Sequence, residues 1–207
     1  MKTLELFCGT KSFSKVAKEL GHDTYTIDIE ERFNPDVRIN ILELDPTLLA
    51  HDFDVIWASP PCQAFSVAAI GKNWYKGGIP KTESALLGLK LLEKTIEIID
   101  ELKPKYWFIE NPRGMMRKMP QVQDFHRNTV TYCQYGDTRM KPTDIWTNFT
   151  DWKPKAPCKN GSPCHISAPR GSKTGTQGLK NAEERGVIPR DLFIEIFKYI
   201  PLDHCTR

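Results

Sequence analysis

Two patterns of apolar positions alternate along the first two thirds of the chain. Short apolar runs, typical of buried strands, occur at residues 3–7, 24–29, 54–58 and 106–109. Longer segments with apolar residues at helical spacing occur at residues 12–20, 83–102 and, near the end of the chain, 189–199. Strands that alternate with helices are typical of a mostly parallel sheet with helices on both faces, so we predict an α/β fold.

Length and composition set limits on this fold. A chain of 207 residues suits a single domain, here residues 1–207. It contains no apolar run of about 18 residues and does not begin like a signal peptide, so we expect a cytoplasmic protein that does not enter a membrane. Six cysteines are too few for a disulfide scaffold in a chain of this length, and the net charge of +3 says little about partners.

The distribution of charge is more informative than its sum. Residues 62–81 contain three lysines and no acidic residue, and residues 153–180 contain six Lys or Arg and again no acidic residue. Cations in such segments neutralise phosphates and release counterions, which predicts a surface for a polyanion. Solvated loops have the same composition, so both interpretations stay open.

The sequence S-P-P-C-Q places Cys62 in a rigid turn directly after a predicted strand. Prolines fix φ and remove backbone donors, and the carboxyl ends of strands are where α/β sheets bind ligands. The sequence I-E-N-P places Glu110 at the end of another apolar strand. Partial desolvation there would raise the pKa of the carboxyl group and suit it to proton donation. We predict that Cys62 and Glu110 form a nucleophile and acid pair.

Two features near the start of the chain predict a nucleoside-bearing cofactor. The stretch L-F-C-G-T-K-S-F-S joins the first strand to the first helix, and Gly9 lets a ligand approach the helix N-terminus closely. Asp28 ends the second strand, where a carboxylate accepts hydrogen bonds from ribose hydroxyls in dinucleotide-binding folds. Each feature alone also fits a plain turn or a solvated acid.

The order F-C-G-T, Asp28, P-P-C-Q, E-N-P and Q-Y-G-D-T-R-M-K resembles the catalytic core of the cytosine-C5 DNA methyltransferases. The resemblance covers residues 1 to about 148 and returns at G-V-I-P-R-D-L-F-I-E-I. It implies a Rossmann-like fold that uses S-adenosyl-L-methionine (S-adenosylmethionine), with DNA as the partner. It also implies methyl transfer to C5 of a flipped cytosine through a covalent bond from Cys62 to C6.

The resemblance further implies a role for each matching residue. The catalytic residues would be Cys62, Glu110, Arg139 and Lys141. The cofactor-binding residues would be Phe7, Cys8, Gly9, Thr10, Lys11, Ser12, Asp28, Ile29, Asn40, Ile41, Ser59, Pro60 and Val187. The substrate-binding residues would be Pro61, Gln63, Ser66, Asn111 and Pro112.

The chain departs from the family pattern at the cofactor turn and after the Tyr-Gly motif. Lys11 and Ser12 stand where the family continues with glycines, so the mouth of the pocket is expected to differ. Arg139 and Lys141 replace a longer arginine motif. Asn40 replaces the usual acid beside the adenine.

Residues 149–185 form a short basic insertion in place of the family's large target-recognition domain. Reading several base pairs needs a set of side chains on a stable support, whereas a basic, Gly-rich segment suits phosphates. We therefore expect a short recognition site, a preference for easily opened DNA, or an accessory specificity partner.

Three alternatives to a DNA methyltransferase stay open. The same chemistry on RNA would be separated by comparing turnover on DNA and tRNA. A catalytically degenerate DNA-binding module of the same fold is suggested by Lys11, although the intact Cys62 and Glu110 argue against it. A modified cofactor with an added carboxylate is the third, since Lys11 or Arg139 would pair with that group.

The sequence C-K-N-G-S-P-C-H contains Cys158, Cys164 and His165, which are ligand types that zinc prefers. A fourth ligand at a matching spacing is missing, and Cys133 or Cys205 would have to complete the set. We therefore assign no metal from the sequence and interpret these residues as ordinary thiols in a loop.

Overall fold

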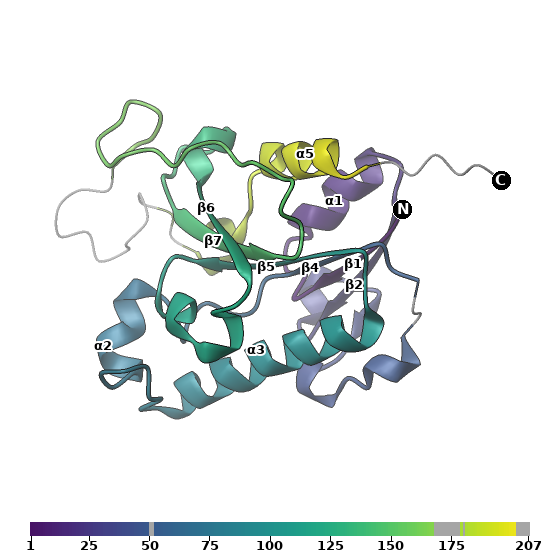
Figure 1. Ribbon diagram of the computed structural model, residues 1–207, viewed down its shortest axis with the longest axis horizontal. Coiled ribbons are helices and arrows are strands. Elements are labelled where there is room, and N and C mark those ends of the chain that lie inside the picture. Colours follow the sequence, from purple (N-terminus) through teal and green to yellow (C-terminus); the bar gives the residue numbers. More distant parts are fainter. Residues whose placement is uncertain (50–51, 168–178, 180, 202–207) are drawn as a thin grey trace.

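A computed structural model describes residues 1–49, 52–167, 179 and 181–201, and the strands within them form one seven-stranded sheet (Figure 1). The strands are β1 (Lys2–Leu6), β2 (Asp23–Asp28), β3 (Val37–Arg38), β4 (Val55–Ala58), β5 (Tyr106–Pro112), β6 (His126–Thr131) and β7 (Pro142–Thr147). Their order is β3-β2-β1-β4-β5-β7-β6, and β7 runs antiparallel to β5 and β6. The pairs among β1 to β5 are parallel, which confirms the predicted mostly parallel sheet.

Helices cover both faces of the sheet, with α1 and α5 on one face and α3 on the other (Figure 1). The helices are α1 (Ser12–Glu19), α2 (Ile70–Asn73), α3 (Glu83–Leu102), α4 (Ala182–Gly186) and α5 (Arg190–Tyr199). On the first face, the Phe13 ring of α1 stacks on Trp57 of β4 and on Phe197 of α5, with centroids 5.7 and 5.4 Å apart. These contacts join α1 near the start of the chain to α5, the last of the described helices.

Local signals explain where the long helix α3 begins and ends. The Thr82 hydroxyl accepts a hydrogen bond from the Ala85 amide and so caps the first turn. Lys103 is left-handed and ends the helix, before Pro104. The bounds of α3 agree with the predicted segment 83–102.

The largest difference from the sequence prediction is the strand pair β6 and β7. Polar residues interrupt the apolar pattern there, and two of them, Thr143 and Asp144, are fully buried. Asp144 is neutralised by Arg117, whose Nε and Nη2 atoms lie 2.9 and 2.5 Å from the carboxylate oxygens. Pairing with β7 also extends β5 to Pro112, beyond the predicted end at residue 109.

The basic insertion begins as a segment that lies against the core. Trp152 is fully buried in the cluster under α5, and its indole N–H donates to Glu195 of that helix. Described residues 153–167 then run past the turn Tyr132–Tyr135, where the Lys155 amide donates to the Tyr135 hydroxyl. Arg170, Lys173 and Lys180, also predicted to bind phosphates, lie outside the described residues. Within the described part of the chain, every helix is too short or too polar to cross a membrane.

Candidate active site

The carboxyl ends of four neighbouring strands bring the predicted site residues into one row. Strand pairing places Leu6 beside Ile27 and Ala58, and Ala58 beside Ile109. The residues that follow these positions therefore share one edge of the sheet: Phe7, Asp28, Ser59 and Glu110. In an open α/β sheet, this edge is where ligands bind.

The turn after β1 is built from alternating left-handed residues. Phe7, Gly9 and Lys11 have φ values of 56°, 45° and 57°. The Gly9 amide donates to Asp28 Oδ2 at 2.9 Å, which ties the turn to the end of β2. Lys11 adopts a conformation that costs a non-glycine residue about 1 kcal/mol or more. Its ammonium group donates to the Asn34 carbonyl.

A buried carboxyl group holds the first helix against β1. Glu5 accepts hydrogen bonds from the amides of Phe13 and Ser14 at 3.2 and 2.9 Å, so it binds the free N–H groups of the first turn of α1. Burial raises the pKa of Glu5 to about 7, against the opposing effect of these bonds. This group fixes the helix that follows the candidate cofactor turn.

The cofactor-side edge offers groups that fit a nucleoside. Asp28 accepts bonds from the Gly9 and Glu30 amides and keeps free lone pairs for hydroxyl groups. Beside it, Ile29 leaves 57% of its surface exposed, an apolar face next to a carboxylate. Val187 is 41% exposed, and the adjacent Ile188 amide donates to the Ser12 hydroxyl, so the C-terminal segment returns to the same turn. Ribose hydroxyls match the carboxylate acceptor of Asp28, and a purine face matches the exposed apolar side chains.

Other predicted cofactor residues turn their side chains inward. Cys8 and Ile41 are 4% and 5% exposed, and burial raises the pKa of the Cys8 thiol to about 12. The Asn40 side chain accepts from the Leu42 amide and donates to Glu43. Thr10 and Ser12 bond to each other through their hydroxyls. We therefore assign the Cys8 and Ile41 side chains to packing.

The P-P-C-Q turn is held in place by β5 and the turn that follows it. Asn111 is fully buried, and its amide donates to the Pro60 carbonyl at 2.8 Å. Gly114 lies against the turn so closely that a Cβ there would stand 2.2 Å from the Phe65 carbonyl oxygen. The Cys62 carbonyl accepts from the amides of Phe65 and Ser66. The turn that carries Cys62 is therefore fixed from two sides.

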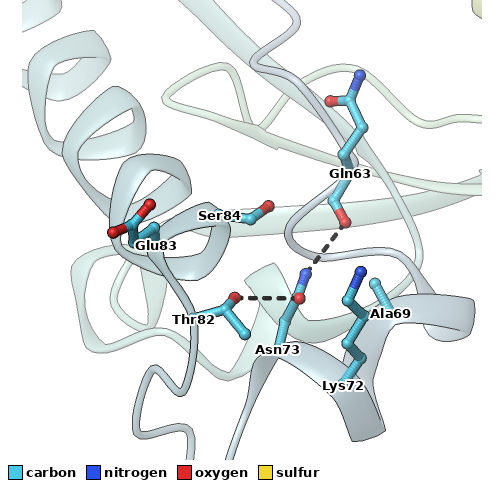
Figure 2. A pocket seen from close by; sticks show the side chains of 7 residues that line it. All are labelled: Gln63, Ala69, Lys72, Asn73, Thr82, Glu83 and Ser84. Atoms are coloured by element: carbon cyan, nitrogen blue, oxygen red, sulfur yellow. Dashed lines mark hydrogen bonds between the residues drawn. The ribbon is translucent and has the colours of Figure 1, made fainter.

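A polar cleft opens beside this turn (Figure 2). Its volume is about 430 Å³, and it is lined by Gln63, Ala69, Lys72, Asn73, Thr82, Glu83 and Ser84. The Asn73 amide donates to the Gln63 and Ala64 carbonyls at 3.4 and 3.3 Å, and Thr82 donates to Asn73. Figure 2 shows how Asn73 links the Cys62 turn to the start of α3.

The remaining predicted substrate residues differ in exposure. Pro61 and Gln63 are exposed, and Ser66 and Pro112 are half-buried. Two predicted cofactor residues lie in the same turn: Pro60 is buried, and the Ser59 hydroxyl accepts a hydrogen bond from the Trp57 indole. Pro61 and Gln63 flank Cys62 in the turn after β4, so these two exposed residues are available to a substrate at that edge of the sheet.

Charges around Cys62 oppose one another. Burial raises the pKa of the Cys62 thiol, the Glu110 carboxylate raises it further, and the Lys141 ammonium group lowers it. Burial also raises the pKa of Glu110, against Lys141 and hydrogen bonds from Tyr132 and Ser59. The Tyr132 hydroxyl donates to Glu110 Oε1 at 3.0 Å. Burial lowers the pKa of Lys141. The structure thus groups a thiol, a carboxyl group and an amine in one desolvated place.

Arg139 is taken up by other partners. Its guanidinium group pairs with Asp137 and donates to the carbonyls of Glu184, Arg185 and Val187. Lys141 donates to the Arg185 carbonyl at 2.7 Å and lies over the Tyr132 ring. Arg139 therefore positions the segment that carries Val187, whereas Lys141 acts electrostatically on Cys62 and Glu110.

Sequence reasoning missed several supporting residues. Tyr132 was missed because a hydroxyl at the end of a strand gives no sign of its partner. Gly114 carried a usable signal, since a glycine just after E-N-P suggests close backbone contact. For Asn73 the sequence held no signal. Cys133 was named only as an option, and the structure brings it to Cys158, Cys164 and His165.

The mostly parallel seven-stranded sheet with helices on both faces is the Rossmann-like fold of S-adenosylmethionine-dependent methyltransferases. The fold is similar to that of the Entamoeba histolytica methyltransferase EhMeth, with a TM-score of 0.55 and 14% identity over 75% of this chain. The match spans 55% of that structure's chain.

Sequence comparisons identify the family. A family model of the C-5 cytosine-specific DNA methylases matches residues 1–128. A protein of Frog virus 3 (isolate Goorha), described as a probable DNA (cytosine-5)-methyltransferase, is 35% identical over 172 residues, which cover 79% of this chain and 78% of the viral protein. The chain belongs to the C-5 cytosine-specific DNA methylase family.

Proposed function

We propose that this protein methylates C5 of cytosine in DNA, with Cys62 as the nucleophile and S-adenosylmethionine as the cofactor. The observation that carries the proposal is the buried Glu110, which stands on the same sheet edge as the Cys62 turn and shares Lys141 with it. A carboxyl group with a raised pKa in that place suits proton donation to a ring nitrogen.

The chain's own residues have complementary parts in this chemistry. The Cys62 thiolate adds to C6 of cytosine, and the proton that Glu110 gives to N3 neutralises the negative charge that the addition places on the ring. S-adenosylmethionine, when bound, supplies an electrophilic methyl group. Loss of the C5 proton to water, departure of the Cys62 thiolate and return of the N3 proton to the Glu110 carboxylate restore the aromatic ring. The ammonium group of Lys141 stabilises negative charge on Cys62 before attack.

The residues proposed to hold the cofactor lie on the β1 and β2 side of the edge. Asp28 would bind the ribose hydroxyls, and the exposed Ile29 would lie on the adenine. Val187 would close the pocket beside Ser12 of α1, from the segment that Arg139 holds in place. This arrangement leaves the Cys62 side of the edge open for the base.

Attack on C6 requires access to a face of the ring. A cytosine stacked in a duplex does not offer that face, so the base must be flipped into the site. The cleft beside Gln63 and Lys72 lies next to the Cys62 turn and carries donors for phosphates or bases (Figure 2). The exposed lysines 153, 155 and 159 extend the basic surface toward a duplex, and we expect an accessory partner or a short site to supply specificity.

DNA is the proposed substrate because the family model and the viral relative are both described as acting on DNA. The test is mass spectrometry of nucleosides after incubation of the protein with S-adenosylmethionine and either duplex DNA or tRNA. We expect 5-methyldeoxycytidine from DNA. Methylcytidine from tRNA alone would show that RNA is the substrate instead of DNA. Unmodified nucleosides from both would support a catalytically degenerate DNA-binding module. A heavier substituent from a modified cofactor would show as a different mass.

A further inference from the structure

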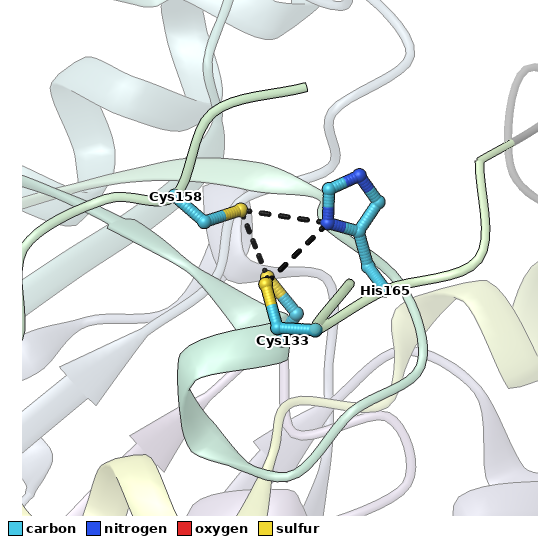
Figure 3. Close-up of side chains that lie close together, drawn as sticks. Cys133, Cys158 and His165 are labelled. Carbon is cyan, nitrogen blue, oxygen red and sulfur yellow. Dashed lines mark hydrogen bonds between the residues drawn. The ribbon is translucent and has the colours of Figure 1, made fainter. Parts of the chain in front are cut away.

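Three thiols and an imidazole converge beside the turn Tyr132–Tyr135 (Figure 3). Cys133 comes from this turn, and Cys158, Cys164 and His165 come from the basic insertion. Their four ligand atoms all lie within 4.8 Å of one another. Figure 3 shows the sulfur atoms of Cys133 and Cys158 and the ring of His165 pointing toward one another.

Three of the separations match the edges of a zinc tetrahedron. The Cys133 and Cys164 sulfurs are 3.6 Å apart, and Nδ1 of His165 is 3.6 Å from the sulfurs of Cys158 and Cys164. Bonds of about 2.3 Å to sulfur and about 2.0 Å to nitrogen give tetrahedral edges of about 3.5–3.8 Å. The Cys133 and Cys158 sulfurs are closer, at 3.1 Å, yet well beyond the length of about 2.05 Å in a disulfide.

Hydrogen bonds hold the residues of the cluster in place. The Gln134 side-chain amide donates to the Cys164 sulfur at 3.4 Å. The Cys158 amide donates to the Thr131 hydroxyl, and the Ile166 amide donates to the Thr138 carbonyl, so backbone bonds hold both ends of the ligand segment. His165 is 9% exposed, although its loop is otherwise mostly exposed. Thiols form only weak hydrogen bonds, so contacts with thiols alone do little to stabilise a buried imidazole in a surface loop.

We propose that Cys133, Cys158, Cys164 and His165 bind a zinc ion that fastens the basic insertion to the catalytic core. Each thiol that binds the metal as a thiolate gives its proton to solvent, and His165 binds through Nδ1 as a neutral imidazole. Three thiolates and one imidazole close the coordination shell, as in structural zinc sites. No redox step is involved.

The position of the site gives it a structural role next to the chemistry. Cys133 directly follows Tyr132, whose hydroxyl donates to Glu110, and Lys155 of the insertion donates to the Gln134 carbonyl. A metal bound here joins the turn behind Glu110 to the segment that carries Lys153, Lys155 and Lys159. Loss of the metal should therefore loosen the insertion while the sheet and Cys62 stay in place.

The experiment measures metal in the purified, reduced full chain. We expect one zinc ion per chain by elemental analysis, and a thiolate-to-metal charge-transfer band after replacement with Co²⁺. His165→Ala and Cys158→Ser should each weaken metal binding by more than about 100-fold, because loss of an outer-shell partner alone costs about 10–100-fold. Matched controls are His126→Ala, at the exposed start of β6, and Cys62→Ser, which should keep the metal and lose methylation.

Several outcomes would overturn the proposal. A folded wild-type chain that takes up neither zinc nor Co²⁺ under reducing conditions has no such site. A disulfide between Cys133 and Cys158, found by peptide mapping without any metal uptake, would replace it. Cys205 lies outside the described residues, and loss of the metal in Cys205→Ser with retention in Cys158→Ser would refute the ligand set. The wild-type measurement does not depend on whether a variant folds.

Discussion

The two halves of the sheet edge are built by different means. On the cofactor side, at β1 and β2, the shape comes from backbone: three left-handed residues, an amide bonded to Asp28, and inward-facing Cys8 and Ile41. On the proposed substrate side, at β4 and β5, the shape comes from side chains, because Asn111 donates to the Pro60 carbonyl and Asn73 donates to the carbonyls of Gln63 and Ala64.

The ionisable groups of the two halves of the sheet edge also have different surroundings. Cys62, Glu110 and Lys141 perturb one another's pKa on the substrate side. On the cofactor side, Glu5 is buried behind the turn and binds a helix terminus. Substitutions on the cofactor side should therefore change stability or affinity, whereas those on the substrate side should change the rate of chemistry.

The two cysteines of the edge give the largest expected contrast. Cys62→Ala should abolish methylation and leave cofactor binding intact, since it removes the thiol that we propose bonds to C6. Cys8→Ala should retain methylation, because the Cys8 side chain is packed in the core, and should cost about 1 kcal/mol of stability through lost packing. Methylation assays and thermal unfolding of both variants compare them directly. Methylation by Cys62→Ala would show that the Cys62 thiol is not needed for the reaction.

The next effect concerns Glu110. Glu110→Gln should lower the methylation rate by roughly 10²-fold or more, as expected for a positioned acid. The rate at which iodoacetamide alkylates Cys62 should instead increase in Glu110→Gln, because Glu110 raises the pKa of that thiol. The alkylation rate should rise with pH in the wild type, since the thiolate reacts and its pKa is raised. In Glu110→Gln the same curve should shift to lower pH.

The control for this pair is Tyr132→Phe, which removes one bond to Glu110 and keeps the carboxyl group. It should change the rate less than Glu110→Gln. An unchanged methylation rate in Glu110→Gln would take Glu110 out of the mechanism, whatever happens to the thiol.

Asp28 tests the cofactor side. Asp28→Ala should weaken S-adenosylmethionine binding by roughly 1.5–3 kcal/mol, the range for hydrogen bonds to a charged group, and leave DNA affinity nearly unchanged. Calorimetry measures both. Asp45→Ala is the matched control, because Asp45 also accepts backbone and hydroxyl bonds but caps an exposed turn. Equal cofactor affinity in the two variants would reduce Asp28 to a structural tie for Gly9.

The smallest effect is the strain at Lys11. Lys11→Gly should raise the free energy of unfolding by about 1 kcal/mol, because glycine adopts a positive φ without cost. Lys15→Gly, in the exposed interior of α1, should lower it by about 1 kcal/mol. Denaturant unfolding of both gives the comparison. Destabilisation by Lys11→Gly would show that its side-chain bond to the Asn34 carbonyl outweighs the strain.

Much of the edge could be predicted from sequence because it follows a local rule. Phe7, Asp28, Ser59 and Glu110 each stand at the end of an apolar run or directly after it, and a parallel sheet aligns such ends. β6 and β7 could not be predicted, because Asp144 is polar yet buried, and its partner Arg117 lies far away in the sequence. Long-range pairings leave no periodic signal.

The roles of single side chains were harder to predict than their places. Arg139 stands in a motif position but binds Asp137 and three carbonyls, which sequence spacing does not reveal. Cys133 lies 25 residues before Cys158 and meets it only because the insertion folds back over the turn. In both cases the information lies in the path of the chain between elements.

Trapping with DNA that carries 5-fluorocytosine at the target position tests the central claim most directly. Fluorine does not leave C5 as a proton does, so the bond between the Cys62 sulfur and C6 should persist after methyl transfer. We expect a covalent complex that is stable to denaturation in the wild type and absent in Cys62→Ala, with Cys62 as the modified residue by mass spectrometry. The same complex in Cys62→Ala would contradict the account.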